Sequence, residues 1–450
     1  MKVLFINSVC GIGSTGRICT DLAQQLEAEG HEVKIAYGRN GTVPVKFQKY
    51  AVRIGSDFDC KMHALQTRIF DTHGFGSKAA TKKFLQWAED YKPDLLWLHN
   101  IHGYYINVEM LFVWIKQHPE MEVRWTLHDC WAFTGHCSHF TMVKCEQWKE
   151  HCSYCSQLRC YPACYIKSSV SKNFERKRKA FTGVKKMTLI TPSNWLADLV
   201  KQSFLKEYPV EVHYNTIDKT IFKPTPSDFR ERYGLENKKI VLGVANIWDE
   251  RKGLRDFYKL AQMLDDNYAI VLVGLSKKQI ADLPKNIKGI IRTNSTKELA
   301  AIYTAVDVFV NPSKEETFGM TTVEAEACGT KAIVYEDTAC AEIAQSNTSI
   351  VVEQDVNAIY KAITGKIFGG VNRSLCYKII CIPRTSSARE LAAIYTMADV
   401  FVNPTYEDNY PTVNLEAQAC GIRVVTYDTG GCRETIKREY LIVEVGEFNR

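Results

Sequence analysis

The 450-residue sequence has no long hydrophobic run, since no stretch approaches the roughly 20 apolar residues that a helix needs to cross a bilayer. Its N-terminus, MKVLFINSV, carries one Lys and a short apolar run that soon meets Gly11. A secretory signal peptide needs a longer apolar stretch and a small-residue cleavage site, so we interpret this segment as a buried strand. We therefore expect the protein in the cytoplasm.

A strong excess of charge of one sign is also lacking, because the net charge is only +6. A zinc-dependent nucleic-acid binder would need a basic face and a complete zinc motif, so nucleic acid is not an expected partner. The one basic concentration, KNFERKRKAFTGVKK, lies at residues 172–186. Such a run is typical of a solvated helix face. The alternative is attraction to a phosphate-bearing substrate or to an anionic membrane, which would place the protein at the inner face of the plasma membrane.

The 16 cysteines lack the spacing of a regular zinc motif. They are mostly scattered, and the one dense stretch, between Cys130 and Cys164, contains a single C-x2-C pair where a strong zinc signal has two. Two interpretations stay open for this stretch: loop packing with free thiols, or a structural zinc site. The zinc ligands would be Cys145, Cys152 and Cys155, completed by Cys160, Cys137 or a neighbouring His. A catalytic metal is not expected.

Short β-branched runs alternate with helical patterns along most of the chain, which predicts βαβ units and parallel sheets. The fold class is α/β, with two doubly wound Rossmann-like domains facing each other across a cleft, at residues 1–210 and 211–365. Ligands of such domains bind at the carboxyl ends of the strands.

Residues 366–450 form a partial repeat of the second domain. ELAAIYTAVDVFVNP at 298–312 returns as ELAAIYTMADVFVNP at 390–404, and EETFGMTTVEAEACG returns as EDNYPTVNLEAQACG at the same offset. The second copy has no counterpart of KKIVLGVANIWDERKG, and it supplies only about two strands and two helices. A half-domain of this size cannot cover both faces of its own sheet, so it should dock on the second domain or be poorly ordered.

Two segments have the features of phosphate sites. In NSVCGIGSTGRI, glycines 11, 13 and 16 stand between a strand and a helix, where backbone N–H groups can approach a phosphate. The alternative is a tight strand-to-helix turn, because the spacing departs from G-x-G-x-x-G. In NIWDERKGL, Arg251 and Lys252 follow a strand and can neutralise a diphosphate, while the alternative there is a solvated loop.

The acids of the repeat suggest a second kind of binding. Glu324 stands about one turn into a helix, and with Thr321 it fits a capping box. In the second copy Glu416 is retained but Val413 replaces the threonine, so a role such as gripping sugar hydroxyls is favoured. The loop acid of the first copy, Glu316, is matched in the second by Asp408.

Histidines end two strands of the first domain, in WLHNIHGYY and WTLHDCW. A lone histidine at such a position is more often structural. Several imidazoles and a carboxylate at neighbouring strand ends favour a catalytic or sugar-binding role. The residues are His99, Asn100, His102, His128 and Asp129.

Together these segments resemble the GT-B glycosyltransferases of family GT4, in particular the bacterial enzymes that build capsular, colanic-acid-like and other exopolysaccharides. The resemblance runs through GSTGRI, LHNIHGYY, TLHDCWAFTGHC, TPSNWLADLV, YNTID, ERKGL and EETFGMTTVEAEACG, and recurs in EDNYPTVNLEAQACG and YDTGG. It implies a retaining glycosyltransferase that moves a sugar from a nucleotide-sugar to a hydroxyl of a saccharide or lipid-linked saccharide. It also implies that the first domain binds this acceptor and the second domain the nucleotide-sugar. No cofactor beyond the nucleotide-sugar is implied.

The resemblance also implies roles for individual residues. His99 or His102 would lie by the reacting sugar, and Glu316 by the donor sugar. Glu324 would hold the ribose, Arg251 and Lys252 the diphosphate. The donor-binding set is completed by Gly13, Ser14, Thr15, Phe318 and Gly319.

The sequence departs from the family pattern at the linker, which reads NTID, and at Asn246 and Ile247, where many relatives have Gly-Arg. We expect the first copy to complete the site, since it follows Lys252 in one uninterrupted βα series. The alternative is a duplicated, catalytically impaired protein that binds nucleotide or partners.

Overall fold

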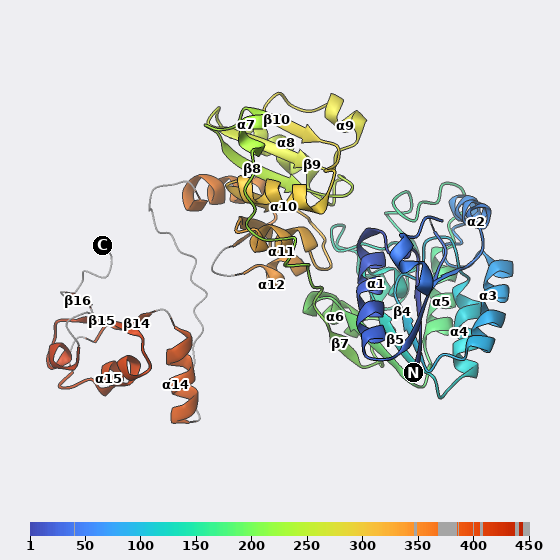
Figure 1. Cartoon of the computed structure of the whole chain (residues 1–450), viewed down its shortest axis with the longest axis horizontal. Helices are drawn as coiled ribbons and strands as arrows, with labels where there is room; N and C mark the ends of the chain where they lie inside the picture. The colour runs from blue at the N-terminus through green and yellow to red at the C-terminus, as the bar shows by residue number, and fades with distance from the viewer. Residues whose placement is uncertain are drawn as a thin grey trace. The chain divides into compact units, whose positions relative to one another are not determined.

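The computed structural model divides into two compact units, Met1–Asn372 and Arg373–Arg450. Two parallel sheets lie in the first unit and a small third sheet in the second (Figure 1). The structure describes residues 1–39, 41–345, 349–367, 385, 387–398, 400–405, 408–436 and 441–443.

Within the described residues the first sheet has seven strands, all paired in parallel, in the order β3-β2-β1-β4-β5-β6-β7. The strands are β1 (Lys2–Asn7), β2 (Glu32–Tyr37), β3 (Ala51–Arg53), β4 (Leu95–Leu98), β5 (Glu122–Thr126), β6 (Met187–Thr191) and β7 (Val210–Val212). The helices are α1 (Gly13–Ala28), α2 (Asp57–Phe70), α3 (Lys78–Tyr91), α4 (Val108–Gln117), α5 (Val170–Phe181) and α6 (Asn194–Lys201), with short 3-10 turns η1 (Val45–Tyr50), η2 (Trp131–Phe133) and η3 (Gln147–Lys149).

The central strand β1 shows why this sheet is covered on both faces. Val3 and Phe5 point into one hydrophobic core and Leu4 and Ile6 into the other, and all four side chains are fully buried. Helix α1 covers the first face, and α3, α4 and α5 cover the second (Figure 1). Full burial of one such side chain contributes about 1.5–3 kcal/mol, so a continuous apolar strand is stable only between two layers of helices.

The second sheet has six strands in the described part of the chain, in the order β10-β9-β8-β11-β12-β13, again all parallel. They are β8 (Lys239–Val244), β9 (Tyr268–Val273), β10 (Ile287–Ile290), β11 (Val308–Asn311), β12 (Lys331–Tyr335) and β13 (Ile350–Val352). The helices are α7 (Phe229–Tyr233), α8 (Leu254–Met263), α9 (Lys277–Ala281), α10 (Thr296–Ala305), α11 (Met320–Ala327), α12 (Ala339–Ile343) and α13 (Val356–Lys361), followed by the π-helix η4 (Ala362–Ile367). The two predicted α/β domains are thus confirmed as two parallel-sheet domains.

The third sheet, β14-β15-β16, belongs to the second unit. Its elements are α14 (Ala388–Met397), β14 (Val400–Asn403), α15 (Thr412–Ala419), β15 (Arg423–Tyr427), η5 (Cys432–Thr435) and β16 (Leu441–Val443). Val400 and Val402 of β14 are 46% and 44% exposed, whereas the matching Val308 and Val310 of β11 are buried. This unit, taken by itself, leaves one face of β14 uncovered.

None of the helices in the described ranges combines the length and the apolar character that crossing a membrane requires.

The domain limits taken from the sequence remain predictions. Residues 210 and 211 fall on β7, and residue 365 falls within η4.

The cysteine-rich segment after β5 is fixed by a buried acid at the end of α2. Asp71 adopts a left-handed conformation with φ of 55°, and its carboxylate contacts Nδ1 of His136 at 2.5 Å and accepts the Ser169 N–H at 3.0 Å. The Asn173 amide donates to the Asp71 carbonyl. These contacts tie the middle of the segment and the start of α5 to α2.

A buried lysine fixes the start of the same segment. Lys177 of α5 lies within the predicted basic run, yet its side chain is buried, and Nζ donates to the carbonyls of Trp131 and Thr134 at 2.7 and 3.0 Å. Burial lowers the pKa of Lys177 to about 7. The basic run is therefore a solvated face only in part, since Lys172, Arg178 and Lys179 are the exposed members of this helix.

Asp71→Ala is expected to lower the free energy of unfolding by about 3 kcal/mol, because it leaves the Ser169 N–H and the His136 imidazole buried without an acceptor. Urea unfolding of the whole chain measures this difference. Asp90→Ala, an exposed aspartate on α3, serves as the control and should change stability by less than about 0.5 kcal/mol. Equal effects of the two substitutions would contradict the assignment.

Candidate active site

Loops that follow the strands of the two sheets contact each other within the Met1–Asn372 unit. The hydroxyl of Thr317, in the loop after β11, donates to the carbonyl of His128, which follows β5. The Ser193 hydroxyl, between β6 and α6, donates to the Thr317 carbonyl at 2.8 Å. The carboxyl ends of the two sheets therefore face each other, where ligands of parallel α/β domains bind.

The loops after β8 and β11 bring a cation and an acid together. Nζ of Lys252 forms an ion pair with Oε2 of Glu316, and both side chains are mostly buried. Burial would raise the pKa of Glu316, but attraction to Lys252 and Arg251 outweighs it and holds the pKa below its usual range. The structure thus places these three predicted residues in one cluster, with Glu316 ionised.

Arg251 also has a structural task. Its Nη1 donates to the carbonyl of Glu315 at 3.0 Å, and its own carbonyl accepts the Lys314 N–H at 2.8 Å. One arm of the guanidinium therefore fixes the loop that carries Glu316.

Helix α11 does not begin with the capping box that the sequence suggests as an alternative. Its N-cap is Gly319, which adopts a φ of 96°, and no side chain caps the helix. A Cβ at this glycine would lie 2.5 Å from Sγ of Cys340, so both the backbone and the space favour glycine. The capping-box interpretation of Thr321 and Glu324 is wrong, because the helix starts two residues earlier in chain order than that motif requires.

Glu324 instead accepts a hydrogen bond from the Tyr303 hydroxyl at 3.1 Å. Burial raises the pKa of Glu324 to about 7, although this hydrogen bond and the charge of Arg17 act in the opposite direction. Arg17 belongs to α1 of the other domain, so the start of α1 lies near Glu324. Phe318 is buried against the loop and has its ring 6.3 Å from that of Tyr214.

Three predicted phosphate-binding residues form the first turn of α1. Gly13 and Ser14 are exposed, and Thr15 lies 3.4 Å from the Asn7 amide. No side chain caps this helix at Ile12, so its first backbone N–H groups are free of a side-chain cap. Such a helix N-terminus favours an anion.

The two candidate histidines occupy different environments. Nδ1 of His99 lies 3.0 Å from Nε2 of His128, and the rings stack at a centroid distance of 5.3 Å. Burial lowers the pKa of His99 well below its usual range and that of His128 to about 4. Both imidazoles are therefore neutral at neutral pH.

His102 is paired with an acid. Its Nε2 lies 2.9 Å from Oδ2 of Asp129, and the Tyr161 hydroxyl lies 3.4 Å from its Nδ1. Burial would raise the pKa of Asp129, but attraction to His102 and the hydrogen bonds from His102 and the Trp131 N–H hold it far below its usual range. The sequence indicates both residues as candidates at neighbouring strand ends, but it does not predict that His102 pairs with Asp129.

The three cysteines proposed as zinc ligands do not form a metal site in the described part of the chain, where no group of three or more His, Cys, Asp or Glu side chains is placed to hold a metal ion. Their thiols are free. Cys152 is buried in the hydrophobic core, and Cys145 and Cys155 pack against it. These observations fit the alternative of loop packing.

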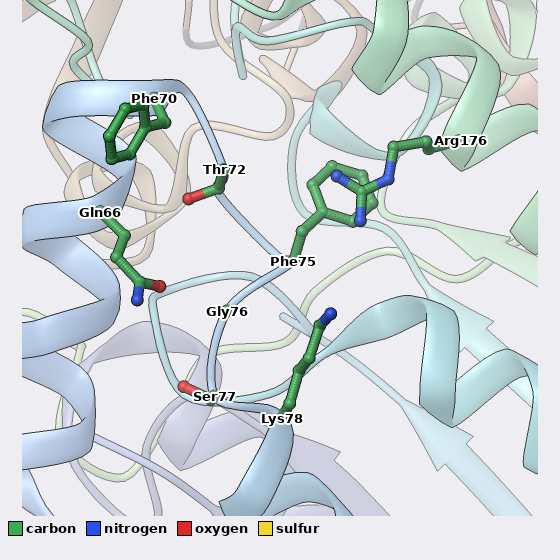
Figure 2. Close-up of a pocket in the computed structure, with 8 residues that line it drawn as sticks. All are labelled: Gln66, Phe70, Thr72, Phe75, Gly76, Ser77, Lys78 and Arg176. Carbon is green, nitrogen blue, oxygen red and sulfur yellow. The ribbon is translucent and has the colours of Figure 1, made fainter.

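A separate pocket of about 500 Å³ lies in the first domain, between the end of α2, the start of α3 and α5 (Figure 2). The guanidinium carbon Cζ of Arg176 lies over the Phe75 ring, 3.7 Å from the ring centroid. Arg176 also forms an ion pair with Glu109. The pocket is lined by Gln66, Phe70, Thr72, Phe75, Gly76, Ser77, Lys78 and Arg176. None of the predicted site residues lines it.

Two protein-family models match parts of the second half of the chain. Residues 238–366 match a family model described as glycosyl transferases group 1, and residues 373–448 match a second model with the same description. The first match covers the domain of the second sheet, and the second match covers the partial repeat.

The relatives that match in sequence include two bacterial proteins. An Escherichia coli (strain K12) protein assigned to colanic acid biosynthesis as the glycosyl transferase WcaC is 27% identical over 209 residues, which are 44% of this chain and 50% of that protein. The N,N'-diacetylbacillosaminyl-diphospho-undecaprenol alpha-1,3-N-acetylgalactosaminyltransferase of Campylobacter jejuni is 34% identical over 113 residues, which are 24% of this chain and 29% of that protein. The chain thus matches half or less of the length of these relatives.

Among solved structures, that of Anabaena Alr3699/HepE in complex with UDP is similar, with a TM-score of 0.53 and 17% identity. The similarity covers 82% of this chain and 92% of that chain. At this identity the comparison shows the fold alone, which is the two-domain GT-B arrangement.

Glu324→Gln is expected to change the pH dependence of stability. The folded-state pKa of Glu324 is raised to about 7. Its contribution to the free energy of unfolding is therefore fully present below the unfolded pKa of about 4.3 and is lost as the pH rises through 7. The glutamine stays neutral, so the variant should gain about 2 kcal/mol relative to wild type between pH 5 and pH 8. Urea unfolding at several pH values measures this gain. The exposed Glu236→Gln controls for the loss of one negative charge and should follow wild type.

Proposed function

From the GT4-like sequence and the GT-B fold of this chain, we propose that it is a retaining glycosyltransferase that moves a sugar from a nucleotide-sugar to a hydroxyl of a saccharide. The acceptor is lipid-linked, and the product is a precursor of a surface polysaccharide such as a capsule or exopolysaccharide. The protein works in the cytoplasm, at the inner face of the plasma membrane.

The observation that carries this proposal is the cluster of Lys252, Glu316 and Arg251 at the carboxyl end of the second sheet, within the segment that matches the glycosyl transferase model. Two cations beside one acid leave a net positive charge, which can pair with the donor diphosphate while Glu316 stays at the site. The first turn of α1 adds backbone N–H groups from the opposite domain. Charge that develops on the departing nucleoside diphosphate is thereby neutralised.

Glu324 is proposed to hold the ribose hydroxyls. It stands one turn into α11, and among the described residues its one hydrogen-bond partner is the Tyr303 hydroxyl, so a carboxylate oxygen is available to a ligand. The HepE structure was solved with UDP, and this supports a uridine diphosphate sugar as the first donor to test.

On the acceptor side we place the reacting sugar by His102, with Asp129 holding the imidazole in position. His99 is instead paired with His128. The name of the C. jejuni relative describes transfer to a sugar on diphospho-undecaprenol, and this supports a lipid-linked acceptor.

The experiment is a panel of UDP- and GDP-sugars, incubated with the whole chain and with lipid extracts that carry saccharide acceptors, with released nucleotide and glycosylated product as readouts. Mass spectrometry of lipid-linked oligosaccharides from cells with and without the gene identifies the natural product. Nucleotide binding by calorimetry without transfer from any donor would instead support the catalytically impaired alternative.

Glu316→Ala and Lys252→Ala are each expected to lower the transfer rate by about 100-fold or more, since each removes a charge at the reacting end of the donor. Asp408→Ala, at the matching position of the second copy, should retain most of the activity. Initial rates with the best donor of the panel measure these effects. Loss of transfer in Asp408→Ala alone would assign the site to the second copy.

A further inference from the structure

Glu315, the residue before the proposed donor-site acid, is fully buried although it carries a carboxylate. Its Oε1 accepts the Phe140 N–H at 2.8 Å, and its Oε2 accepts the Met142 N–H at 3.2 Å. Nδ1 of His139 lies 3.7 Å from Oε1. All three partners belong to the cysteine-rich segment of the first domain, so this carboxylate joins the two domains directly.

The same residue is fixed from its own domain. Its carbonyl accepts the hydrogen bond from Nη1 of Arg251, and its neighbour Glu316 pairs with Lys252. The next residue, Thr317, donates to the carbonyl of His128. The loop 315–317 is therefore attached to the first domain on both sides of Glu316.

The contacts of Glu315 depend on the two domains being together. A buried carboxylate without hydrogen-bond donors is strongly unfavourable, and here two donors are backbone N–H groups that the other domain supplies. If the domains separate, the carboxylate and both N–H groups must be hydrated again. Burial would raise the pKa of Glu315, but the nearby His139 imidazole and the hydrogen bonds from the two N–H groups lower it overall, so the carboxylate is charged at neutral pH.

We propose that Glu315 is a positioning residue that holds segment 138–142 of the acceptor side against the donor loop, and so fixes Glu316 and Lys252 in their working positions. This inference rests on the proposed glycosyl transfer. It gives the cysteine-rich segment a task in the reaction: the segment presents two backbone N–H groups to a carboxylate of the opposite domain. Closure of the domains and alignment of the donor site are then one event.

The test compares wild type with Glu315→Ala, Glu315→Gln and a control, Glu326→Gln. The amide of the glutamine variant keeps one oxygen that accepts an N–H, whereas alanine keeps none. Glu326 is a matched control, because its carboxylate accepts the Gln345 N–H and the Ser349 hydroxyl within the second domain. Within the described residues it makes no hydrogen bond or ion pair with segment 138–142.

Hydrogen exchange followed by mass spectrometry reports on the contact itself. In Glu315→Ala the peptide that contains Phe140 and Met142 should exchange at least about 10-fold faster, with an intermediate value in Glu315→Gln and no change in Glu326→Gln. Unchanged exchange in Glu315→Ala would overturn the proposal.

Kinetics then separate positioning from general stability. UDP affinity, measured by calorimetry, should stay within about threefold in all variants, while kcat falls about 100-fold in Glu315→Ala and about 10-fold in Glu315→Gln. A wild-type kcat in Glu315→Ala, or a loss confined to UDP affinity, would overturn the positioning role. If wild type itself neither binds UDP nor transfers sugar, the proposed function fails, and the exchange experiment still decides whether Glu315 holds the segment.

Discussion

Parallel pairing of the strands is the constraint on which the rest of this structure depends. A parallel strand needs a crossover, and the crossover helices must cover both faces of the sheet, as the opposite cores around β1 show. The same constraint puts the carboxyl ends of all strands of a sheet at one edge. The loops after β5 and β6 therefore lie at that edge of the first sheet, and the loops after β8 and β11 at that edge of the second. Function at that edge then requires charged groups to be buried between two domains.

The structure meets that requirement by giving each buried acid a different partner. Glu316 is kept ionised by a lysine, Glu315 by His139 together with two backbone N–H groups, and Asp129 by the His102 imidazole. Within the described residues Glu324 accepts one hydrogen bond, from the Tyr303 hydroxyl, and burial dominates there, so its pKa rises to about 7. Fixed negative charge is thus held where domains and loops must be aligned, while the acid proposed for the ribose can change its protonation state near neutral pH.

The sequence predicted much of this arrangement, because hydrophobic periodicity and strand-end residues are local signals. Both parallel sheets follow from the sequence, and so do Lys252 and Glu316 as candidate donor-site residues, which form an ion pair in the structure. Contacts between distant segments were beyond reach. Glu315 stands beside Glu316, and nothing local shows that its partners are amides of Phe140 and Met142. Local rules also failed where tertiary structure overrides them: Gly319 starts α11 in place of a capping box, and Lys177 enters the core from a basic run.

The near-identity of residues 298–312 and 390–404 has a consequence for folding. Two segments of the same chain carry almost the same helix and strand, and each has the pattern that pairs with β8 and β12. Parallel sheets close slowly because their contacts are far apart in sequence, so two such segments compete for one place while the sheet is incomplete. During synthesis the earlier segment emerges first and takes that place. On refolding from denaturant both segments are present from the start. The order of synthesis then no longer decides which of them joins the second sheet.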